Sequence, residues 1–294
     1  MTQFFQQFVN GLSIGSIYAL MAVGYSLVYS IMNFSNFAHG SVIMLGAYFG
    51  FYALTLLGLP FPLAFLVAAL ATGGVAVLLE RLAYKPLRER KAPFLYFIIT
   101  AMGASIFIDN LVIATIGPTY KRFPDVFASG SIDIGSLTIG RIDLAMFAIA
   151  AVCLAALIIF IDYTKMGKAI QATAYNMKAS ALMGISPNFI IIVVFAIGGG
   201  LAGVAGVLYG MKYLVYPQIG AITLKSFIAA VFGGLGSLPG ALIGSVLLGL
   251  IETFVSGYIP NGTQYRDLFV FLILIVTLVI RPSGIMGKSV EDKA

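Results

Sequence analysis

The sequence predicts an all-α protein, a polytopic transmembrane helical bundle. Of its 294 residues, 60% are hydrophobic and only 10% are charged, whereas about 25% of residues are charged in a typical soluble domain. The mean hydropathy is +1.03, and a soluble chain of this composition would expose large apolar patches and aggregate. Apolar runs of about 20 residues, the length that crosses a bilayer, recur along the chain. Each span is expected to be helical, because a segment in lipid must satisfy its own backbone hydrogen bonds.

Eight apolar runs are predicted to cross the membrane: 9–31, 38–57, 63–82, 94–116, 144–161, 189–211, 240–258 and 267–281. A ninth run, 221–236, is weaker and interrupted by glycines, and we expect it to cross as a broken span. The prediction is therefore about nine crossings, eight plus one broken span. They form a single transmembrane domain over residues 1–294, because no stretch between the runs is long enough for a soluble domain.

The distribution of basic residues predicts the orientation. With nine crossings, eleven basic residues fall on one side: Arg81, Lys85, Arg88, Arg90, Lys91, Lys165, Lys168, Lys178, Arg281, Lys288 and Lys293. Six fall on the other: Lys121, Arg122, Arg141, Lys212, Lys225 and Arg266. The positive-inside rule assigns the first set to the cytoplasm, with the N-terminus outside and the C-terminus inside. Because the basic residues follow the ends of apolar runs and form no basic face, we expect no nucleic-acid partner.

The loops and glycines carry two further structural predictions. The longest outside loop, 117–143, contains the alternating segment SIDIGSLTIGRID, which indicates a small pair of β-strands. Gly199 and Gly203, like Gly206 and Gly210, are four residues apart and lie on one helix face. Small residues at this spacing favour close helix packing in a membrane.

The chain lacks the side chains that an enzyme would need. A tail segment ends in Gly-Lys-Ser, but Pro282 stands where a phosphate-binding loop requires glycine. His39 is the only histidine and Cys153 the only cysteine, which leaves metal sites and Ser-His chemistry without support. We therefore expect no catalytic residue, no cofactor and no bound metal, and any energy-converting domain must come from another polypeptide.

Two short interruptions break the apolar pattern, at residues 33–40 and 233–240, and each is followed by an apolar helix. Interrupted hydrophobic segments in corresponding positions of two halves point to a transport pathway. The alternative is a pair of ordinary turns rich in Asn, Gly and Pro. We expect Asn36 and His39 to hydrogen-bond to backbone at the first break. The candidates for the pathway or helix breaks are Asn33, Asn36, His39, Gly40, Gly234, Gly236, Pro239 and Gly240.

Two acidic residues, Asp109 and Glu252, lie within apolar runs. Charged side chains are costly in hydrocarbon and usually face the bundle interior or water. Both residues fall in the outer half of their spans. An interfacial or structural role and a proton relay are the two interpretations.

The segment 162–188 is the best functional candidate of the cytoplasmic loops. Its small and apolar residues predict two short amphipathic helices separated by a turn near Asn176, with Gly184 ending the second helix. Such a flat surface suits docking on a partner protein. The alternative is a connector that lies on the bilayer surface.

Several motifs then match a known family: Asn36-Phe-Ala-His-Gly40, Met44-Leu-Gly-Ala-Tyr48, the segment 167–185, Leu224–Phe227, Val231–Ala241, Tyr265–Asp267 and Arg281–Gly284. Together they span nearly the whole chain. The sequence resembles the permeases of branched-chain amino-acid ABC transporters, and within them the H-type subunit of the bacterial leucine, isoleucine and valine uptake system.

The resemblance implies a function and a set of partners. The chain would form the translocation path with a second homologous permease in the bacterial cytoplasmic (inner) membrane. Two ATP-binding subunits would power import, and a periplasmic binding protein would deliver the substrate. The loop that docks on the ATPase corresponds here to Lys178, Ala179, Ser180 and Gly184. Lys178 replaces the acidic residue often found at the start of this element, and Ser180 replaces its second alanine.

Other functions remain open at this point. A permease for another small solute of the same superfamily, a sugar or a nucleoside, is the nearest alternative. A secondary transporter coupled to protons through Asp109 or Glu252 is another, and a passive channel or membrane scaffold is a third.

Overall fold

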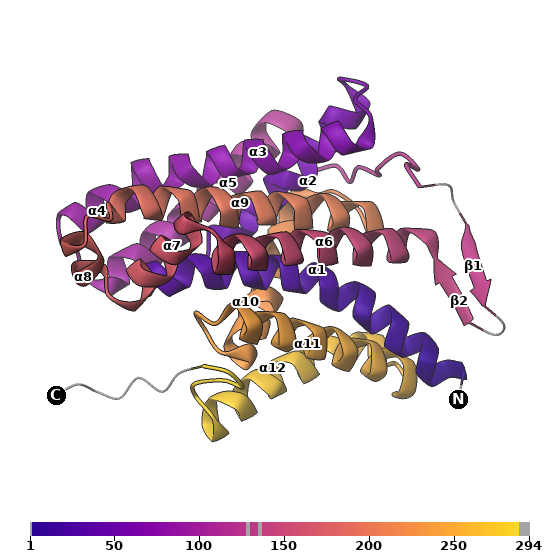
Figure 1. Cartoon of the computed structure of the whole chain (residues 1–294). Coiled ribbons are helices and arrows are strands. Elements are labelled where there is room, and N and C mark those ends of the chain that lie inside the picture. The colour runs from indigo at the N-terminus through magenta and orange to yellow at the C-terminus, as the bar shows by residue number, and fades with distance from the viewer. Residues whose placement is uncertain (1, 128–129, 135–136, 288–294) are drawn as a thin grey trace. The chain divides into compact units, whose positions relative to one another are not determined.

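The computed structural model describes residues 2–127, 130–134 and 137–287, and most of this length is helical (Figure 1). The elements in chain order are α1 (Thr2–Met32), α2 (His39–Thr55), α3 (Phe61–Leu79), the π-helical turn η1 (Glu80–Tyr84), α4 (Lys85–Glu89), α5 (Phe94–Ile116), β1 (Ser131–Ile134), β2 (Leu137–Gly140), α6 (Arg141–Tyr163), α7 (Lys165–Tyr175), α8 (Met177–Leu182), α9 (Pro187–Lys212), the 3-10 helix η2 (Pro217–Ile222), α10 (Thr223–Gly233), α11 (Leu238–Tyr258) and α12 (Gly262–Ile280).

Each apolar run identified in the sequence coincides with a helix. Seven helices of the described chain are long and apolar enough to cross a membrane: α1, α3 with its extension to Glu89, α5, α6, α9, α11 and α12. The helix α2, with 17 residues, and the apolar stretch Pro217–Gly233 are shorter. The prediction of an all-α polytopic membrane protein is therefore confirmed, while the count of nine crossings stays a prediction.

The helices form two compact units. Unit 1 contains Met1–Ser26, Phe127–Ala150 and Leu224–Ala294, and unit 2 contains Leu27–Val126 and Ala151–Thr223. The helices α1 and α6 each contribute to both units.

Glycines bring α9 close to α2 and α3 in unit 2. A β-carbon on Gly206 would overlap the carbonyl oxygen of Ile43 in α2, and one on Gly199 would overlap the side chain of Ala76 in α3. A β-carbon on Gly203 would also overlap α3. The close packing expected from the spacing of these glycines is confirmed, because none of the three positions has room for a larger side chain.

The helices α1 and α11 run antiparallel in unit 1. Near one end, Gln3 donates from Nε2 to the carbonyl oxygen of Gly257 at 2.7 Å. In the middle, the backbones of Gly15 and Gly249 are in direct contact. Near the other end, the backbone N–H of Gly236 donates to Ser26 Oγ at 3.0 Å. This pair forms the frame on which α10 and α12 pack.

The predicted strand pair is also present in unit 1. The strands β1 and β2 are antiparallel, with Ser131 opposite Gly140. The side chain of Gln6 in α1 holds β2 at two points. Its Nε2 donates to the Thr138 carbonyl oxygen at 2.8 Å, and the Thr138 N–H donates to its Oε1 at 3.1 Å. The hairpin is thus fixed beside the N-terminal turns of α1.

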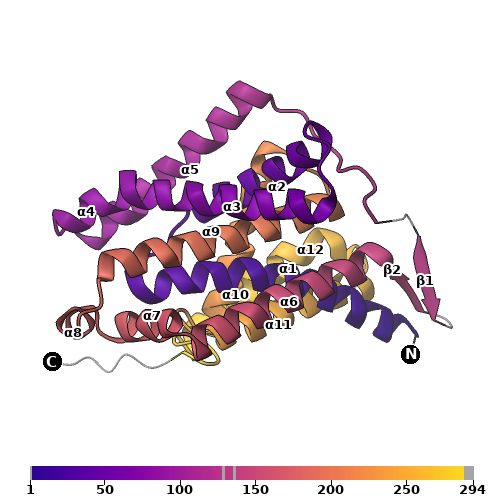
Figure 2. The same ribbon diagram turned by 45° about the horizontal axis from the view of Figure 1, so that its top comes forward.

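Two basic segments of unit 2 lie at one end of it. The short helices α4 and α8 lie at the same end of this unit in both views (Figures 1 and 2). Helix α4 and the residues beside it carry the 81–91 basic cluster, and α8 belongs to the 162–188 segment. The two loops assigned to the cytoplasm by their charge therefore share one end of unit 2.

Candidate functional site

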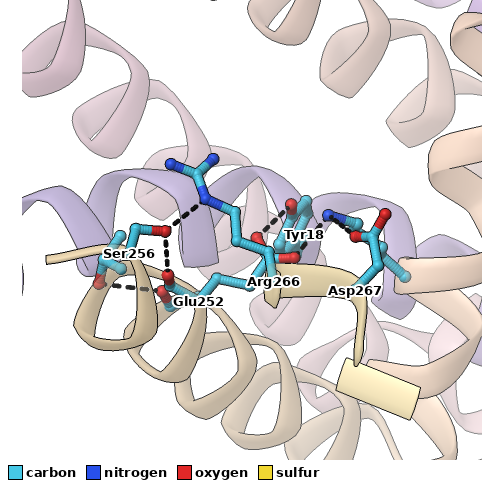
Figure 3. Close-up of polar contacts among 8 residues, drawn as sticks. Tyr18, Glu252, Ser256, Arg266 and Asp267 are labelled. Carbon is cyan, nitrogen blue, oxygen red and sulfur yellow. Dashed lines mark hydrogen bonds and ion pairs between the residues drawn. The ribbon is translucent and has the colours of Figure 1, made fainter. Parts of the chain in front are cut away.

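A buried charge cluster surrounds Glu252 in unit 1. Glu252 is 3% exposed, and its carboxylate accepts a hydrogen bond from Tyr18 Oη at 2.8 Å and another from Lys225 Nζ at 2.6 Å. Lys225 also forms an ion pair with Asp267 at 2.9 Å. Figure 3 shows Tyr18, Glu252 and Asp267 converging from α1, α11 and α12. Lys225 belongs to α10. Four helices are therefore joined through one carboxylate and one ammonium group.

A second contact lies beside this cluster and ties α11 to α12. Arg266 donates from Nε to Ser256 Oγ, and Ser256 donates in turn to the carbonyl oxygen of Glu252 at 2.7 Å (Figure 3). The sequence pattern identified Glu252 but not its partner Lys225, nor Asp267 as the second partner of that lysine. Lys225 lies in the motif Leu224–Phe227, and Asp267 lies in the motif Tyr265–Asp267. The signal that could have linked them to Glu252 is that each charge lies in or beside an apolar helix.

Asp109 lies in a smaller polar cluster in unit 2. Ser41 in α2 donates to Asp109 Oδ1 at 2.7 Å and also lies 2.8 Å from Ser105 Oγ. The aspartate on α5 is half-buried. Its hydrogen bond to α2 compensates part of the cost of a carboxylate within an apolar helix.

The first interruption is built around Asn36. Its Oδ1 accepts from the Ala38 N–H at 3.2 Å and from Tyr84 Oη at 2.7 Å. Asn33 is exposed and adopts a left-handed conformation with φ of 52°. His39 is 3% exposed, begins α2, and donates its backbone N–H to the Asn36 carbonyl oxygen at 3.2 Å. The expected hydrogen bond from the Asn36 side chain to backbone is confirmed.

Gly40 is the last residue of the same interruption and packs closely against η2 and Thr223. A β-carbon at this position would overlap the Gly220 carbonyl oxygen in η2 and the Thr223 hydroxyl. Only glycine allows these two backbone segments to meet. The residue therefore has a packing reason for its identity, and its role in a pathway stays a prediction.

The second interruption, residues 233–240, contains a glycine turn at 234–237 in unit 1. Gly234 and Gly236 have φ of 117° and 82°, a region that disfavours other residues. Ser237 caps α11 by accepting from the Gly240 N–H at 3.2 Å, and Pro239 lies in the first turn, where it is tolerated. Gly240 packs directly against the backbone of Gly233. These geometries explain the turn, and a pathway role for it stays a prediction.

The 162–188 segment contains the two expected short helices, α7 and α8. Thr164 caps α7 by accepting from the Gly167 N–H at 3.0 Å. Asn176 separates the helices, and its Oδ1 accepts from the N–H groups of Lys178 and Ala179, both at 3.0 Å. Gly184, with φ of 82°, follows the end of α8. The turn near Asn176 and the glycine stop are both confirmed.

This segment presents large apolar side chains outward. Tyr175, Leu182 and Met183 are 86%, 90% and 82% exposed. Lys178 and Ala179 are exposed as well, whereas Ser180 is 4% exposed and donates to the Met177 carbonyl oxygen at 2.9 Å. Three exposed large apolar residues within nine positions suit contact with a partner protein or with the bilayer surface, so docking stays a prediction.

Comparisons with known proteins agree with the family resemblance of the sequence motifs. A family model described as branched-chain amino acid transport system / permease component matches residues 7–278. The high-affinity branched-chain amino acid transport system permease protein BraD of Pseudomonas aeruginosa is 40% identical, and the alignment covers 99% of this chain and 98% of that protein. The corresponding permease protein LivH of Escherichia coli is 39% identical, with 99% and 97% covered.

A more distant relative is the fructose import permease protein FruF of Bifidobacterium longum, which is 27% identical over 63% of this chain and 57% of its own length. The resemblance that the sequence motifs carry is therefore confirmed by near-complete alignments. This chain belongs to the family of branched-chain amino acid transport system permease components.

Proposed function

We propose that the chain is the membrane-spanning permease subunit of an ATP-driven importer of leucine, isoleucine and valine. The observation that carries this proposal is the near-complete alignment with BraD and LivH, which are named as high-affinity branched-chain amino acid permeases. The fructose permease FruF matches at lower identity and over 63% of the chain. The comparison therefore favours a branched-chain amino acid over a sugar as substrate.

The proposed partners follow from the family to which the chain belongs. As in ABC importers of this family, two ATP-binding subunits would power transport and a periplasmic binding protein would capture the substrate. A second homologous permease completes the path across the bacterial inner membrane. The exposed apolar residues of α7 and α8, beside Lys178 and Ala179, support this segment as the ATPase coupling loop.

We further propose an outside N-terminus and an inside C-terminus. In unit 1, Gln3 bonds to Gly257 at one end of the α1 and α11 pair, and Ser26 bonds to Gly236 at the other. Gly287 packs in the turn just before α11, at this second end. The 31 residues of α1 extend about 46 Å, more than the roughly 30 Å hydrocarbon core. This arrangement supports termini on opposite sides of the membrane.

The ninth crossing is supported by the direction of α10. In unit 1, Gly244 of α11 packs against the carbonyl oxygen of Ala229, and Gly240 packs against Gly233. The helix α10 therefore runs antiparallel to α11, toward the end at which α11 begins. Its 11 residues extend only about 16 Å, so the crossing needs η2 as well. The segment 221–236 thus fits a broken span.

A proton-coupled transporter is less well supported by the geometry. Glu252 forms an ion pair with Lys225 at 2.6 Å, and Asp109 accepts a hydrogen bond from Ser41. Both carboxylates therefore already have partners within their own units. Structural roles for both carboxylates are consistent with an importer that is powered by separate ATPase subunits.

The test is reconstitution of the affinity-tagged chain with the subunits that co-purify with it. Proteoliposomes with internal ATP and external binding protein should accumulate radiolabelled leucine, and ATP hydrolysis should rise when the loaded binding protein is added. Accumulation driven by a pH gradient without ATP would instead support the proton-coupled alternative. Accumulation of fructose but not leucine would overturn the proposed substrate.

A further inference from the structure

A π-helical turn interrupts unit 2 just before the basic α4 helix. The turn η1, Glu80–Tyr84, follows α3 directly, and the Lys85 N–H donates to the Glu80 carbonyl oxygen across the wider π-type ring. Such turns are rare and frequently occur at functional sites. Both end residues, Glu80 and Tyr84, are 0% exposed. The turn therefore directs a carboxyl group and a phenol into the interior of the unit.

Tyr84 connects this turn to the first helix interruption. Its hydroxyl donates to Asn36 Oδ1 at 2.7 Å. Its ring packs edge-on against Phe34, with the centroids 5.0 Å apart, and against Phe195 of α9 at 5.7 Å. Because Asn36 also caps the turn that precedes His39, a shift of Tyr84 would move the start of α2.

Arg88 connects the same turn to the start of α9. Its Nη2 lies 2.9 Å from Glu80 Oε1 and 3.0 Å from Asn188 Oδ1. Its Nη1 lies 3.9 Å from the sulfur of Met32, the last residue of α1. One guanidinium group therefore contacts the end of α1, the π-helical turn and the first turn of α9.

The contact with Glu80 has a clear electrostatic reason. The Glu80 side chain is 1% exposed, and its oxygens accept no well-aligned hydrogen bond among the described residues. A buried carboxylate without a cation is strongly destabilising. Arg81 is 3.9 Å away and 44% exposed, whereas Arg88 is closer and 19% exposed. Arg88 is thus the principal counter-ion of Glu80, and this pair fixes the guanidinium where it can reach Asn188.

Asn188 lies at the junction with the α7–α8 segment. It is the second residue of α9, four positions after Gly184, and the intervening backbone is held by a bond from the Ile185 N–H to the Ser180 carbonyl oxygen at 3.1 Å. A short, hydrogen-bonded connection therefore ties α8 to Asn188. Its side chain then meets Arg88.

We propose that Arg88 is a positioning residue for energy coupling, which links the α7–α8 segment through Asn188 to the π-helical turn and, through Tyr84, to the interruption at Asn36. The inference rests on the proposed function, because it assumes that the ATPase subunits move α7 and α8. The contacts form a continuous path between two segments that are separated in sequence. It consists of the Asn188–Arg88 hydrogen bond, the Arg88–Glu80 ion pair, the π-helical turn from Glu80 to Tyr84, and the Tyr84–Asn36 hydrogen bond. Coupling along this path is measured as leucine imported per ATP hydrolysed.

The test uses Asn188→Ala in the reconstituted importer complex. Asn188 is exposed, so its removal breaks the Arg88 contact without leaving a buried charge. ATPase binding and ATP hydrolysis should stay at the wild-type level, while leucine imported per ATP falls by about five- to tenfold, the size of a modest coupling between sites. Arg88→Lys, which keeps the charge beside Glu80 but not the planar fork, should have a similar effect. The double variant should be no worse than either single one, because both remove one interaction.

Arg90→Gln is the matched control, since Arg90 is exposed in the same basic loop and its removal should leave leucine per ATP unchanged. Wild-type leucine per ATP in both Asn188→Ala and Arg88→Lys would overturn the inference and leave the proposed function intact. A wild-type complex that neither binds an ATPase nor imports leucine would instead overturn the proposed function. Additive losses in the double variant would also count against a shared contact. If Arg88→Lys does not fold, Asn188→Ala alone decides the question.

Discussion

Lys225 Nζ lies 2.6 Å from Glu252 Oε1, and this ion pair joins the first turn of α10 to α11 within unit 1. The two side chains are unequal in burial: Glu252 is 3% exposed and Lys225 is 23% exposed. Lys225 has a second acidic partner, Asp267, which is 69% exposed. The short α10 helix, which lacks the length to span a membrane, is therefore held to α11 and α12 by one ammonium group.

The asymmetry of this pair predicts unequal effects of substitution. Lys225→Met should destabilise the chain by about 3–5 kcal/mol, because it leaves Glu252 buried without its cation. Glu252→Gln should cost less, since Lys225 keeps Asp267 and part of its solvent contact. Thermal unfolding of the purified chain in detergent measures both.

The double variant Lys225→Met with Glu252→Gln tests the cause. It should recover most of the stability lost in Lys225→Met, since no buried charge remains. Asp267→Asn is the control and should cost about 1 kcal/mol or less, as expected for an exposed partner. A double variant as unstable as Lys225→Met alone would show that packing of the lysine, and not its charge, stabilises this site.

The glycines of α9 give a second prediction. Gly206→Ala should destabilise the chain by about 1–3 kcal/mol, because the new methyl group would overlap the Ile43 carbonyl oxygen and force α2 away. Gly200→Ala is matched to it on the same helix, since its β-carbon would lie 3.5 Å from the nearest atom, the Ala69 carbonyl oxygen. We expect Gly200→Ala to be neutral or stabilising. Equal thermal midpoints for the two variants would contradict the packing assigned to Gly206.

Much of the fold follows from local signals in the sequence. The apolar run 94–116 coincides with α5, Phe94–Ile116, because hydropathy and the flanking Pro93 define both ends. Asn176 begins α8 through side-chain capping, and Gly184 follows its end with a positive φ. Both features depend on the residues themselves. Such features need no tertiary partner, and they were predicted correctly.

The features that were missed depend on tertiary contacts. Helix α3 continues through the π-helical turn into α4, although the apolar run ended at residue 82, because Glu80 and Tyr84 are buried against other elements. Lys225 and Glu252 are separated by 27 residues, and no periodicity links them. Helix α1 begins at Thr2, seven residues before the apolar run, since Gln3 and Gln6 form hydrogen bonds with Gly257 and Thr138 that hydropathy does not register.

The proposed topology predicts the location of both termini. A reporter that works only in the cytoplasm should be active when it is fused after Lys293. A tag placed before Met1 should be accessible from the periplasm. One ground for this prediction is the excess of basic residues on one side. The other is that Gln3 and Gly287 lie at opposite ends of the α1 and α11 pair. If both termini are found on one side, the 221–236 segment is re-entrant and the chain has an even number of crossings.

The last prediction concerns the coupling loop. Ala179→Glu should leave the chain folded and in the membrane, because Ala179 is exposed and its N–H remains capped by Asn176. The new carboxylate would lose its hydration on the ATPase surface, so pull-down of the ATPase subunits or stimulation of ATP hydrolysis by the loaded binding protein should fall by about tenfold or more. Gly184→Asp should act similarly, because it adds a charge to the same surface. It also strains the backbone, since φ is 82° at this position.

Asp125→Asn serves as the control, because Asp125 is exposed and lies far along α9 from α8. Its neighbour Phe123 contacts Gly210 near the C-terminus of α9, whereas α8 precedes the N-terminus of α9. This variant should keep wild-type pull-down and stimulation. The physical basis of the contrast is the position of α8, which exposes Leu182 and Met183 beside Ala179 and offers an apolar surface to a partner. Normal pull-down and normal stimulation in both Ala179→Glu and Gly184→Asp would exclude this surface from coupling. The basic loop 81–91 would then be the next proposed cytoplasmic surface to test. Pull-down of the ATPase subunits and stimulation of ATP hydrolysis would be compared between variants of Arg88 and Arg90.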